Sequence, residues 1–362
     1  MKRIVFTVTN DLCFDQRMIR IASSLANNGY AVTLVGRKKK ASPPLQAQPF
    51  HQKRLSCFFE KGMLFYAEYN IRLFFYLLFT RVDIIGAIDL DSILPCYFVS
   101  VLKNTSRIYD AHELFCEMHE IVSRPRIYRF WKRVEKFAVP KFSIGYTVNK
   151  PIAEEFKRMY GVDYEIVRNL PVFYELSDTI KKEKFILYQG AVNEGRSFET
   201  LIPAMKWVNA PLIICGDGNF MEQARILVKT HQLEEKVIFK GMLLPEELKS
   251  INSKAWAGVT LFSSDGKSNY YSLANRFFDY IQAGIPQLCV DYPVYQEINN
   301  LHRIAVLTKD LSPQTLAHHL NELLQNESLY NTLRQNCLNA RTVFNWQEEE
   351  KKLLSFYKIK FA

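Results

Sequence analysis

The chain has 362 residues, 48% of them hydrophobic and 23% charged, which predicts a folded protein with a sizeable core and room for two domains. Its seven cysteines are scattered, odd in number and form no CxxC pair, which argues against a disulfide framework and a cysteine-ligated metal. The formal charge of +10 is uneven, because residues 1–170 hold 26 Lys and Arg against 16 Asp and Glu, whereas residues 171–362 hold 21 of each.

This asymmetry indicates an anionic partner for the first half. The sequence has no zinc-finger, helix-turn-helix or RNP-like motif, so we expect no nucleic acid partner. An anionic membrane surface or a phosphate-bearing lipid acceptor fits better, and the alternative is an ordinary solvated surface. No apolar run reaches membrane-spanning length, and residues 1–10 hold too short a run for a signal peptide. We therefore expect a cytoplasmic protein, with peripheral contact to the inner face of the cytoplasmic membrane as a further hypothesis.

Strand and helix patterns alternate through the first half of the chain. Residues 4–9 read as a strand, and residues 15–28 have the apolar stripe of a helix. A basic, proline-containing loop is predicted from residue 37 to about residue 54. Further strands are predicted at residues 31–35, 84–88, 107–110, 144–148 and 165–167. This alternation predicts a doubly wound parallel sheet in a domain of residues 1–170.

Two helical segments of the first half differ from the others in composition. Residues 63–79 are aromatic and apolar on all sides, which favours a helix packed in the core. A helix lying on a membrane is the alternative, because basic residues flank the segment. Residues 124–139 form a strongly basic helix with interleaved aromatics, and a membrane- or acceptor-contacting face and a solvated amphipathic helix are both open. The residues that we expect at its functional face are Arg126, Arg129, Lys132 and Arg133.

A histidine lies where parallel sheets bind their ligands. The strand at residues 107–110 runs into the tetrad Asp110-Ala111-His112-Glu113, so His112 follows the carboxyl end of a strand. A substrate-contacting histidine and a structural histidine are both open at this point.

The alternation restarts after a charged, aperiodic stretch at residues 175–183. Strands are predicted at residues 185–189, 212–215 and 237–239. The turn after the first of these contains Gly190 and Arg196, and a guanidinium there is suited to bind phosphate through paired hydrogen bonds. A surface arginine in a turn is the alternative. There is no full GxGxxG motif, which disfavours a dinucleotide dehydrogenase.

The second half is organised around residues 258–290, where a strand, a polar loop, a helix and a second strand follow one another. Ser272 is a candidate N-cap for a helix predicted over residues 272–282, and Gly284 is placed for a left-handed C-cap. A strand, loop and helix in this order offer backbone N–H groups to an anionic ligand. Ser272 and Leu273 lie at the predicted start of this helix, and Asn275, Arg276 and Asp279 share one of its faces.

In their order and spacing, these segments resemble the retaining glycosyltransferases of the GT-B fold, family 4 (group 1) type, over nearly the whole chain. Residues 279–286 are similar to the second half of that family's motif, which places seven residues between two acids, with Asp279 in place of Glu. Tyr271 stands at the position of the first acid. The family also has two basic residues in the turn after Gly190; Arg196 matches the second, and Ala191 stands at the first.

The resemblance implies two Rossmann-like domains with doubly wound parallel sheets that face a cleft. It implies an acceptor-binding domain of residues 1–170, a linker of residues 171–184 and a nucleotide-sugar-binding domain of residues 185–343. Residues 344–362 would form a helix that packs back on the first domain.

The resemblance also implies residue roles: Asp279 would hydrogen-bond the ribose, Gly190, Arg196 and Arg276 would lie around the diphosphate, and His112 would contact the donor sugar. The expected reaction moves a sugar, with retention, from a UDP- or GDP-type sugar to a glycan or lipid-linked acceptor in cell-surface polysaccharide or lipid-linked glycan assembly. No metal or other cofactor is expected. The alternatives are a sugar-nucleotide epimerase and a non-catalytic partner protein on a degenerate GT-B scaffold.

Overall fold

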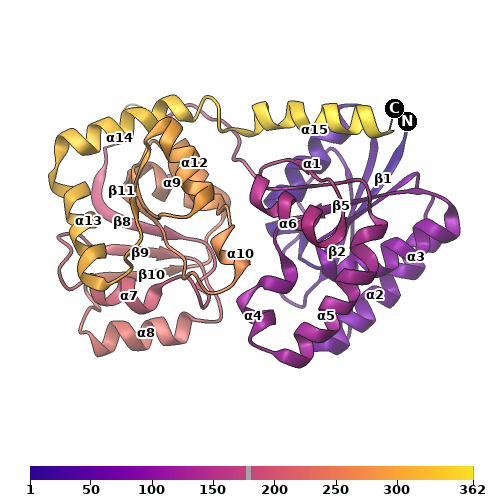
Figure 1. Ribbon diagram of the computed structural model, residues 1–362, viewed down its shortest axis with the longest axis horizontal. Coiled ribbons are helices and arrows are strands. Elements are labelled where there is room, and N and C mark those ends of the chain that lie inside the picture. The colour runs from indigo at the N-terminus through magenta and orange to yellow at the C-terminus, as the bar shows by residue number, and fades with distance from the viewer. Residues whose placement is uncertain (177–180, 362) are drawn as a thin grey trace. The chain divides into compact units, whose positions relative to one another are not determined.

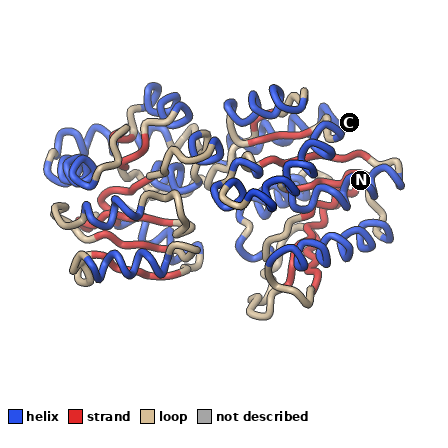
Figure 2. The backbone as a smooth tube through the Cα atoms, turned by 60° about the horizontal axis from the view of Figure 1, so that its bottom comes forward, coloured by secondary structure: helices blue, strands red, loops and turns tan. Residues whose placement is uncertain are grey.

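The computed structural model describes residues 1–176 and 181–361, which divide into two units (Figure 1). The first unit is Met1–Asn169 together with the segment that begins at Glu349, and the second is Leu170–Glu348. Residues 177–180, part of the predicted linker 171–184, lie outside the described residues. Each unit has its own parallel sheet between helices (Figure 2).

The first unit holds a seven-stranded sheet in the order β3-β2-β1-β4-β5-β6-β7, in which every pair is parallel. Its strands are β1 (Arg3–Thr7), β2 (Ala31–Lys38), β3 (His51–Ser56), β4 (Ile84–Ile88), β5 (Ser106–Ala111), β6 (Gly145–Thr147) and β7 (Glu165–Ile166). Its helices are α1 (Gln16–Asn27), α2 (Gly62–Phe79), α3 (Ile93–Lys103), α4 (His119–Val122), α5 (Pro125–Ala138) and α6 (Lys150–Tyr160), with 3-10 turns η1 (Leu12–Phe14), η2 (Leu90–Ser92), η3 (Phe115–Glu117) and η4 (Val139–Lys141). The strand order reverses between β1 and β4, and doubly wound sheets bind ligands at such a reversal, beyond the carboxyl ends of the strands.

The stretch after β2 differs from the predicted loop. β2 runs on to Lys38, and residues 51–56 pair with it as the edge strand β3. No side chain of β3 is fully buried, so this strand lacks the apolar alternation on which a sequence-based prediction depends.

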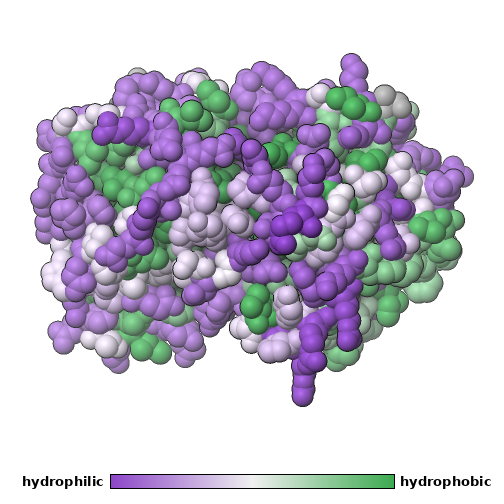
Figure 3. Space-filling view, in the orientation of Figure 1, coloured by the Kyte–Doolittle hydropathy of each residue, from purple (hydrophilic) through white to green (hydrophobic). Residues whose placement is uncertain are grey.

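Helix α2 forms as predicted, but the interpretation of it as a core helix is wrong. Phe65, Tyr69, Leu73 and Leu77 form a buried stripe with a spacing of four residues. The other side of the helix leaves large apolar side chains in solvent, of which Phe79 is 82% exposed. Figure 3 shows hydrophobic residues gathered over α2 and α3 at the right of the view. An apolar surface of this kind needs a ligand or partner to explain it.

The last helix, α15 (Trp346–Phe361), packs on the first unit. Tyr357 is fully buried, and its ring centroid lies 6.5 Å from that of Phe6, 6.0 Å from that of Tyr30 and 6.4 Å from that of Tyr146. Near the start of the helix, the Glu349 carboxylate accepts a hydrogen bond from the backbone N–H of Arg168 at 2.8 Å.

The second unit holds a six-stranded parallel sheet in the order β10-β9-β8-β11-β12-β13. Its strands are β8 (Glu183–Gln189), β9 (Leu212–Cys215), β10 (Val237–Gly241), β11 (Ala255–Thr260), β12 (Gln287–Val290) and β13 (Ala305–Thr308). Its helices are α7 (Phe198–Ala204), α8 (Met221–Thr230), α9 (Pro245–Lys254), α10 (Lys267–Tyr270), α11 (Asn275–Gln282), α12 (Pro293–His302), α13 (Pro313–Gln325) and α14 (Glu327–Ala340). Here the order reverses between β8 and β11.

The two sheets confirm the predicted α/β class and its two doubly wound parallel sheets. Within residues 1–176 and 181–361, every helix falls short of the length or the apolarity that crossing a bilayer requires.

Candidate functional site

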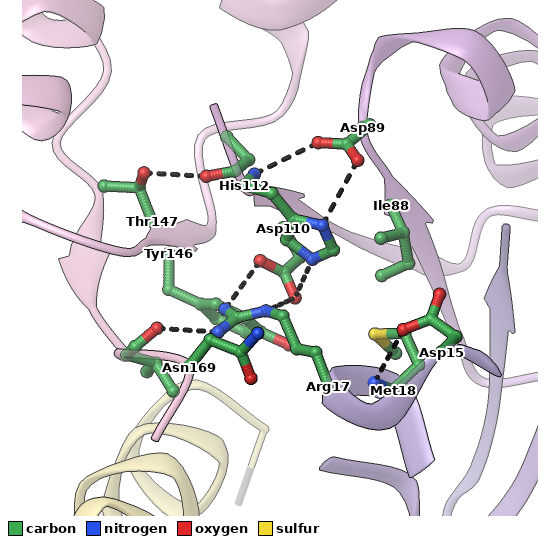
Figure 4. Close-up of polar contacts among 12 residues, drawn as sticks. Asp15, Arg17, Met18, Ile88, Asp89, Asp110, His112, Tyr146, Thr147 and Asn169 are labelled. Atoms are coloured by element: carbon green, nitrogen blue, oxygen red, sulfur yellow. Dashed lines mark hydrogen bonds and ion pairs between the residues drawn. The ribbon is translucent and has the colours of Figure 1, made fainter. Parts of the chain in front are cut away.

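In the first unit, His112 lies between two carboxylates at the carboxyl edge of the sheet (Figure 4). Its Nδ1 is 3.2 Å from an oxygen of Asp89, and its Nε2 is 3.3 Å from an oxygen of Asp110. The backbone N–H of His112 also donates to Asp89, at 3.1 Å. Burial opposes a charge on the imidazole, but the two carboxylates outweigh burial and raise the pKa of His112 well above its ordinary value. The two carboxylates therefore favour the protonated form of the imidazole.

Asp110 is fixed from the other side by Arg17 of α1. The two side chains form a bidentate ion pair, with Nη2–Oδ1 at 2.8 Å and Nε–Oδ2 at 3.1 Å, and both are buried. Arg17 also donates to the carbonyl of Val167 at 3.0 Å. Burial would raise the pKa of Asp110, but Arg17 and His112 outweigh it and lower that pKa. Asp110 is thus a buried carboxylate with a cation on each side.

Asp89, directly after β4, has a backbone conformation that L-residues rarely adopt. Its φ is 56° and its ψ is 176°, a region occupied almost only by glycine. Such strain persists where the surroundings hold a residue in place, and Asp89 is held by both His112 contacts and by its own N–H, which donates to the carbonyl of Asp110 at 3.0 Å. Sequence reasoning did not identify Asp89 or Arg17 as site residues.

In the second unit, Arg276 lies in the first turn of α11 and is buried. Its guanidinium carbon is 4.7 Å from the ring centroids of both Tyr188 and Phe262. Among the described residues, its Nη atoms make only long hydrogen bonds, of 3.4 Å each, to the Tyr188 hydroxyl and the carbonyl of Leu261, and its buried Nε has no hydrogen-bond partner. No carboxylate of the described residues forms an ion pair with it. A desolvated guanidinium in this state is a ready site for an anion.

Two glycines pack the ends of β8 and β9 together beside Arg276. Gly190 follows β8 with a φ of 116°, and a Cβ added there would lie 3.5 Å from the Arg276 guanidinium. Gly216, which follows the neighbouring strand β9, packs so closely that a Cβ added to it would lie 1.8 Å from the carbonyl oxygen of Gly190. Both positions therefore require glycine, and the backbone of two strand ends closes one wall of the site.

Arg196 reaches the same place from the turn after β8. Its guanidinium carbon lies 4.5 Å from the Phe262 ring centroid, and its Nη1 donates to the Asn269 side chain at 3.1 Å. Arg196 and Arg276 thus share one aromatic ring, which concentrates positive charge at the reversal between β8 and β11.

Asp279 lies one turn beyond Asn275 on α11, beside the end of β8. One of its carboxylate oxygens accepts a hydrogen bond from the Gln189 side chain at 2.6 Å. Gln189 is buried, and its side-chain oxygen Oε1 has no hydrogen-bond partner in the described part of the chain. Sequence reasoning missed Gln189, for which the available signal was a polar residue at the end of an otherwise apolar strand.

Of the two predictions about the ends of α11, the N-cap is wrong and the C-cap is confirmed. The helix begins at Asn275 rather than at Ser272, because the N–H of Ala274 donates to the Tyr295 hydroxyl at 3.0 Å and the short helix α10 precedes this point. Ser272 is therefore not its N-cap, and Ser272 and Leu273 precede the helix. The left-handed C-cap is confirmed: Gly284 has a φ of 61°, and the N–H of the next residue donates to the carbonyl of Tyr280.

The predicted basic face of α5 is only partly exposed. Arg126, Arg129 and Arg133 are exposed. Lys132 points inward, with its Nζ 2.7 Å from Glu135 and 3.6 Å from Glu117, so its expected place at the functional face is wrong. Those two carboxylates, one of them buried, account for its orientation.

Residues 176–340 match the family model described as glycosyl transferases group 1. A curated relative from Candida albicans, chitobiosyldiphosphodolichol beta-mannosyltransferase, is 24% identical over 235 residues, which cover 60% of this chain and 50% of the relative. The chain thus spans about half the length of that relative.

Solved structures share the fold across the whole chain. Sucrose-phosphate synthase from Thermosynechococcus elongatus superposes with a TM-score of 0.83 at 17% identity and covers 100% of both chains. Anabaena Alr3699/HepE in complex with UDP-glucose has a TM-score of 0.78 at 13% identity, with 99% of this chain and 100% of that chain covered. WaaG, a glycosyltransferase involved in lipopolysaccharide biosynthesis, has a TM-score of 0.69 at 15% identity, with 99% and 100% covered. Residues 176–340 are therefore similar to a group 1 glycosyl transferase domain, and the whole chain has the fold of these solved structures.

Proposed function

We propose that the protein transfers a sugar from a nucleotide-diphosphate sugar to an acceptor hydroxyl with retention of anomeric configuration. The observation that carries this proposal is the buried Arg276, which has no carboxylate partner among the described residues and lies against Gly190 at the reversal of a parallel sheet. An anionic ligand would complete this site, and the group 1 match covers it. Anabaena HepE, which shares the fold, was solved with UDP-glucose, and this supports a UDP-type donor here.

In this proposal the second unit binds the donor. Asp279, held by Gln189, would accept hydrogen bonds from the ribose hydroxyls. Arg196 and Arg276 would bind the diphosphate, together with backbone N–H groups at the start of α11 near Leu273 and Asn275. Their charge would stabilise the leaving nucleotide diphosphate as the glycosidic bond breaks, which is the task that positive groups perform in phosphate-releasing reactions. Because two guanidiniums supply this charge, we propose a reaction without a metal ion.

In this proposal the first unit supplies His112 and binds the acceptor. His112 is held by Asp89 at its Nδ1, whereas its Nε2 lies 3.3 Å from Asp110 without a hydrogen bond among the described residues, so the Nε2 N–H would donate to a donor-sugar oxygen. No protein nucleophile is assigned, so the acceptor hydroxyl would attack from the face that the diphosphate leaves.

We assign the acceptor to the first unit and propose a lipid-linked glycan. The Candida relative is by its name a transferase acting on a diphosphodolichol-linked sugar, and the first half of this chain carries the whole excess of positive charge. Arg126, Arg129 and Arg133 would hold the protein at an anionic membrane surface on the cytoplasmic side.

Thermal unfolding with a panel of nucleotides and their sugars tests the donor site. A ligand that binds the folded state raises the melting temperature by mass action. We expect one nucleoside diphosphate, UDP or GDP, to stabilise the wild type and to lose its effect on Asp279→Ala. If no nucleotide stabilises the wild type, the donor proposal is wrong. Donor binding without turnover on any lipid-linked acceptor would instead favour a non-catalytic partner protein, which the departures at Tyr271 and Ala191 would then explain.

A further inference from the structure

Two adjoining cavities lie in the first unit, beyond the carboxyl ends of β1, β2 and β4. The larger has a volume of about 300 Å³ and is lined by Arg37, Lys39, Glu60 and Lys61. The smaller has a volume of about 140 Å³ and lies between α2, α3 and α5. The Tyr66 side chain belongs to the walls of both, so the two cavities are one ring apart.

The larger cavity is cationic. Three basic side chains, Arg37, Lys39 and Lys61, face one acid, Glu60. Arg37 is held in place, because its Nη2 donates to the carbonyl of Glu60 at 3.0 Å and its guanidinium carbon lies 4.1 Å from the Phe65 ring centroid. No carboxylate of the described residues forms an ion pair with Arg37. A preorganised guanidinium with two nearby ammonium groups is suited to phosphate.

The smaller cavity is apolar, with walls that include Leu90, Leu94, Phe130 and Trp131. Two polar residues of its wall, Asn70 and Asp91, already make hydrogen bonds. The Asn70 amide donates to the backbone carbonyls of Tyr66 at 2.8 Å and Asp91 at 2.9 Å, and the Asp91 carboxylate accepts a hydrogen bond from Thr9. Few hydrogen-bonding groups remain for a sugar, which favours a hydrocarbon ligand.

Exposed apolar side chains also surround the smaller cavity. Met63 and Phe130, both 43% exposed, stand at its wall, and Leu64 on the same helix as Met63 is 61% exposed. Exposed apolar surface beside a cationic pocket is complementary to an anionic amphiphile, whose head group and chain require these two environments side by side.

We propose that the two cavities together bind one phosphate-bearing lipid, with the phosphate on Arg37, Lys39 and Lys61 and the first part of the chain between α2, α3 and α5. The larger cavity also contains Thr9 and Asn10, which follow β1, and so lies at the sheet edge that carries Asp89 and His112. The inference rests on the proposed function, in which such a lipid carries the acceptor sugar and would present it at that edge.

The test is calorimetric titration of the full chain, without any nucleotide, using dodecyl phosphate below its micelle concentration. Inorganic phosphate and an uncharged dodecyl ether are titrated in parallel. We expect dodecyl phosphate to bind at least tenfold more tightly than either, and to change the fluorescence of Trp131, which lines the small cavity.

Two variants and a control locate the site. Arg37→Gln/Lys61→Gln removes two of the three positive charges, and Ala67→Trp, at an exposed wall position of α2, obstructs the small cavity without disturbing the core. Each should weaken dodecyl phosphate binding at least tenfold at unchanged thermal stability. Lys150→Gln/Lys157→Gln removes two exposed lysines of α6, at positions outside both cavities, and should leave binding unchanged.

Several results would overturn the proposal. Equal affinity for inorganic phosphate and dodecyl phosphate would reduce the site to a phosphate site, and equal affinity for the uncharged ether would reduce it to an apolar surface. Binding only to anionic vesicles would assign these residues to the membrane surface. Because no donor is present, failure here leaves the transfer reaction untested and intact, whereas tight lipid binding with no transfer would count against the proposed function alone.

Discussion

In the first unit, the buried Arg17 and Asp110 and the partly buried His112 belong to one network in which every cation faces a carboxylate. In the second unit, the buried Arg276 has two aromatic rings and two long hydrogen bonds as its neighbours. Both lie at the carboxyl edge of a doubly wound parallel sheet. The same fold thus keeps one charged site fully paired and the other open.

The difference separates two tasks. In the paired network, the electrostatic interactions hold His112 in one orientation and one protonation state before a ligand binds. An unpaired buried cation is costly in the free protein, and that cost is relieved when an anion binds. We therefore expect substitutions in the first network to lower stability, and substitutions of the open cation to lower affinity.

The largest expected effect is on Asp110. Asp110→Ala leaves the buried Arg17 without its partner, so the free energy of unfolding should fall by about 3–5 kcal/mol. Urea unfolding measures it. Asp83→Ala is the matched control, because Asp83 forms the same bidentate contact with Arg3, at 2.7 and 3.0 Å, with 36% of its side chain exposed. Asp83→Ala should lower the free energy of unfolding much less than Asp110→Ala does, because its ion pair is at the surface. Equal losses would show that the Asp110 pair is no better than a surface pair.

The next effect concerns Arg276. Arg276→Met removes an unpaired buried charge, so stability should be unchanged or higher, while affinity for the stabilising nucleoside diphosphate should fall about ten- to a hundredfold, the loss of one charged hydrogen-bonding partner. Calorimetric titration measures it. Arg225→Met is the control, because Arg225 also lies 4.7 Å from a phenylalanine ring, that of Phe239, but is exposed. If Arg276→Met is strongly destabilised but binds the nucleotide with normal affinity, Arg276 stabilises the fold as the first network does, and the comparison between the two units is wrong.

Sequence patterns and the family resemblance predicted Arg196, Arg276 and Asp279 as ligand-binding residues, and this stays a prediction. They missed residues whose role depends on a distant partner. Gln189 is 90 residues from Asp279, and Arg17 is 93 residues from Asp110, so nothing local indicates either pair. Long-range contacts of this kind appear only when the strands are placed side by side.

The fold shows the same division. Alternating strands and helices predicted both sheets, but the polar edge strand β3 has no apolar signal and was assigned to a loop. Helix α2 is apolar all round, so its period could not show which side faces solvent. The start of α11 was misplaced because a tyrosine hydroxyl 21 residues away takes the N–H of Ala274.

A smaller effect concerns the pH dependence of stability in the first unit. Burial, and then the nearby Asp89, raise the pKa of Asp91 from 3.8 to about 7. The folded chain therefore binds more protons than the unfolded chain between these values, and this contribution to stability is complete at low pH and is lost as pH rises toward 7. Asp91→Asn should remove a slope of about 1 kcal/mol per pH unit, measured by urea unfolding from pH 4 to 7. Asp163→Asn, whose side chain is 80% exposed, should keep the wild-type slope. If Asp91→Asn keeps the wild-type dependence of unfolding free energy on pH, Asp91 is not the group that titrates in this range.

The smallest effect sharpens the comparison within one helix, because α5 carries both a paired and an exposed cation. Arg129 and Arg133 are exposed, whereas Lys132 is enclosed by Glu135 and Glu117. Each basic residue near an anionic membrane contributes about 1 kcal/mol, so Arg129→Gln should weaken binding to phosphatidylglycerol vesicles about fivefold at unchanged stability. Lys132→Gln should lower thermal stability and leave vesicle binding unchanged. The reason is that it leaves a buried carboxylate without its partner and removes no charge from the exposed face. Vesicle co-sedimentation and thermal unfolding of both variants separate the two roles. If Lys132→Gln weakens vesicle binding as much as Arg129→Gln, the membrane responds to the net charge of the first unit and not to this face of the helix.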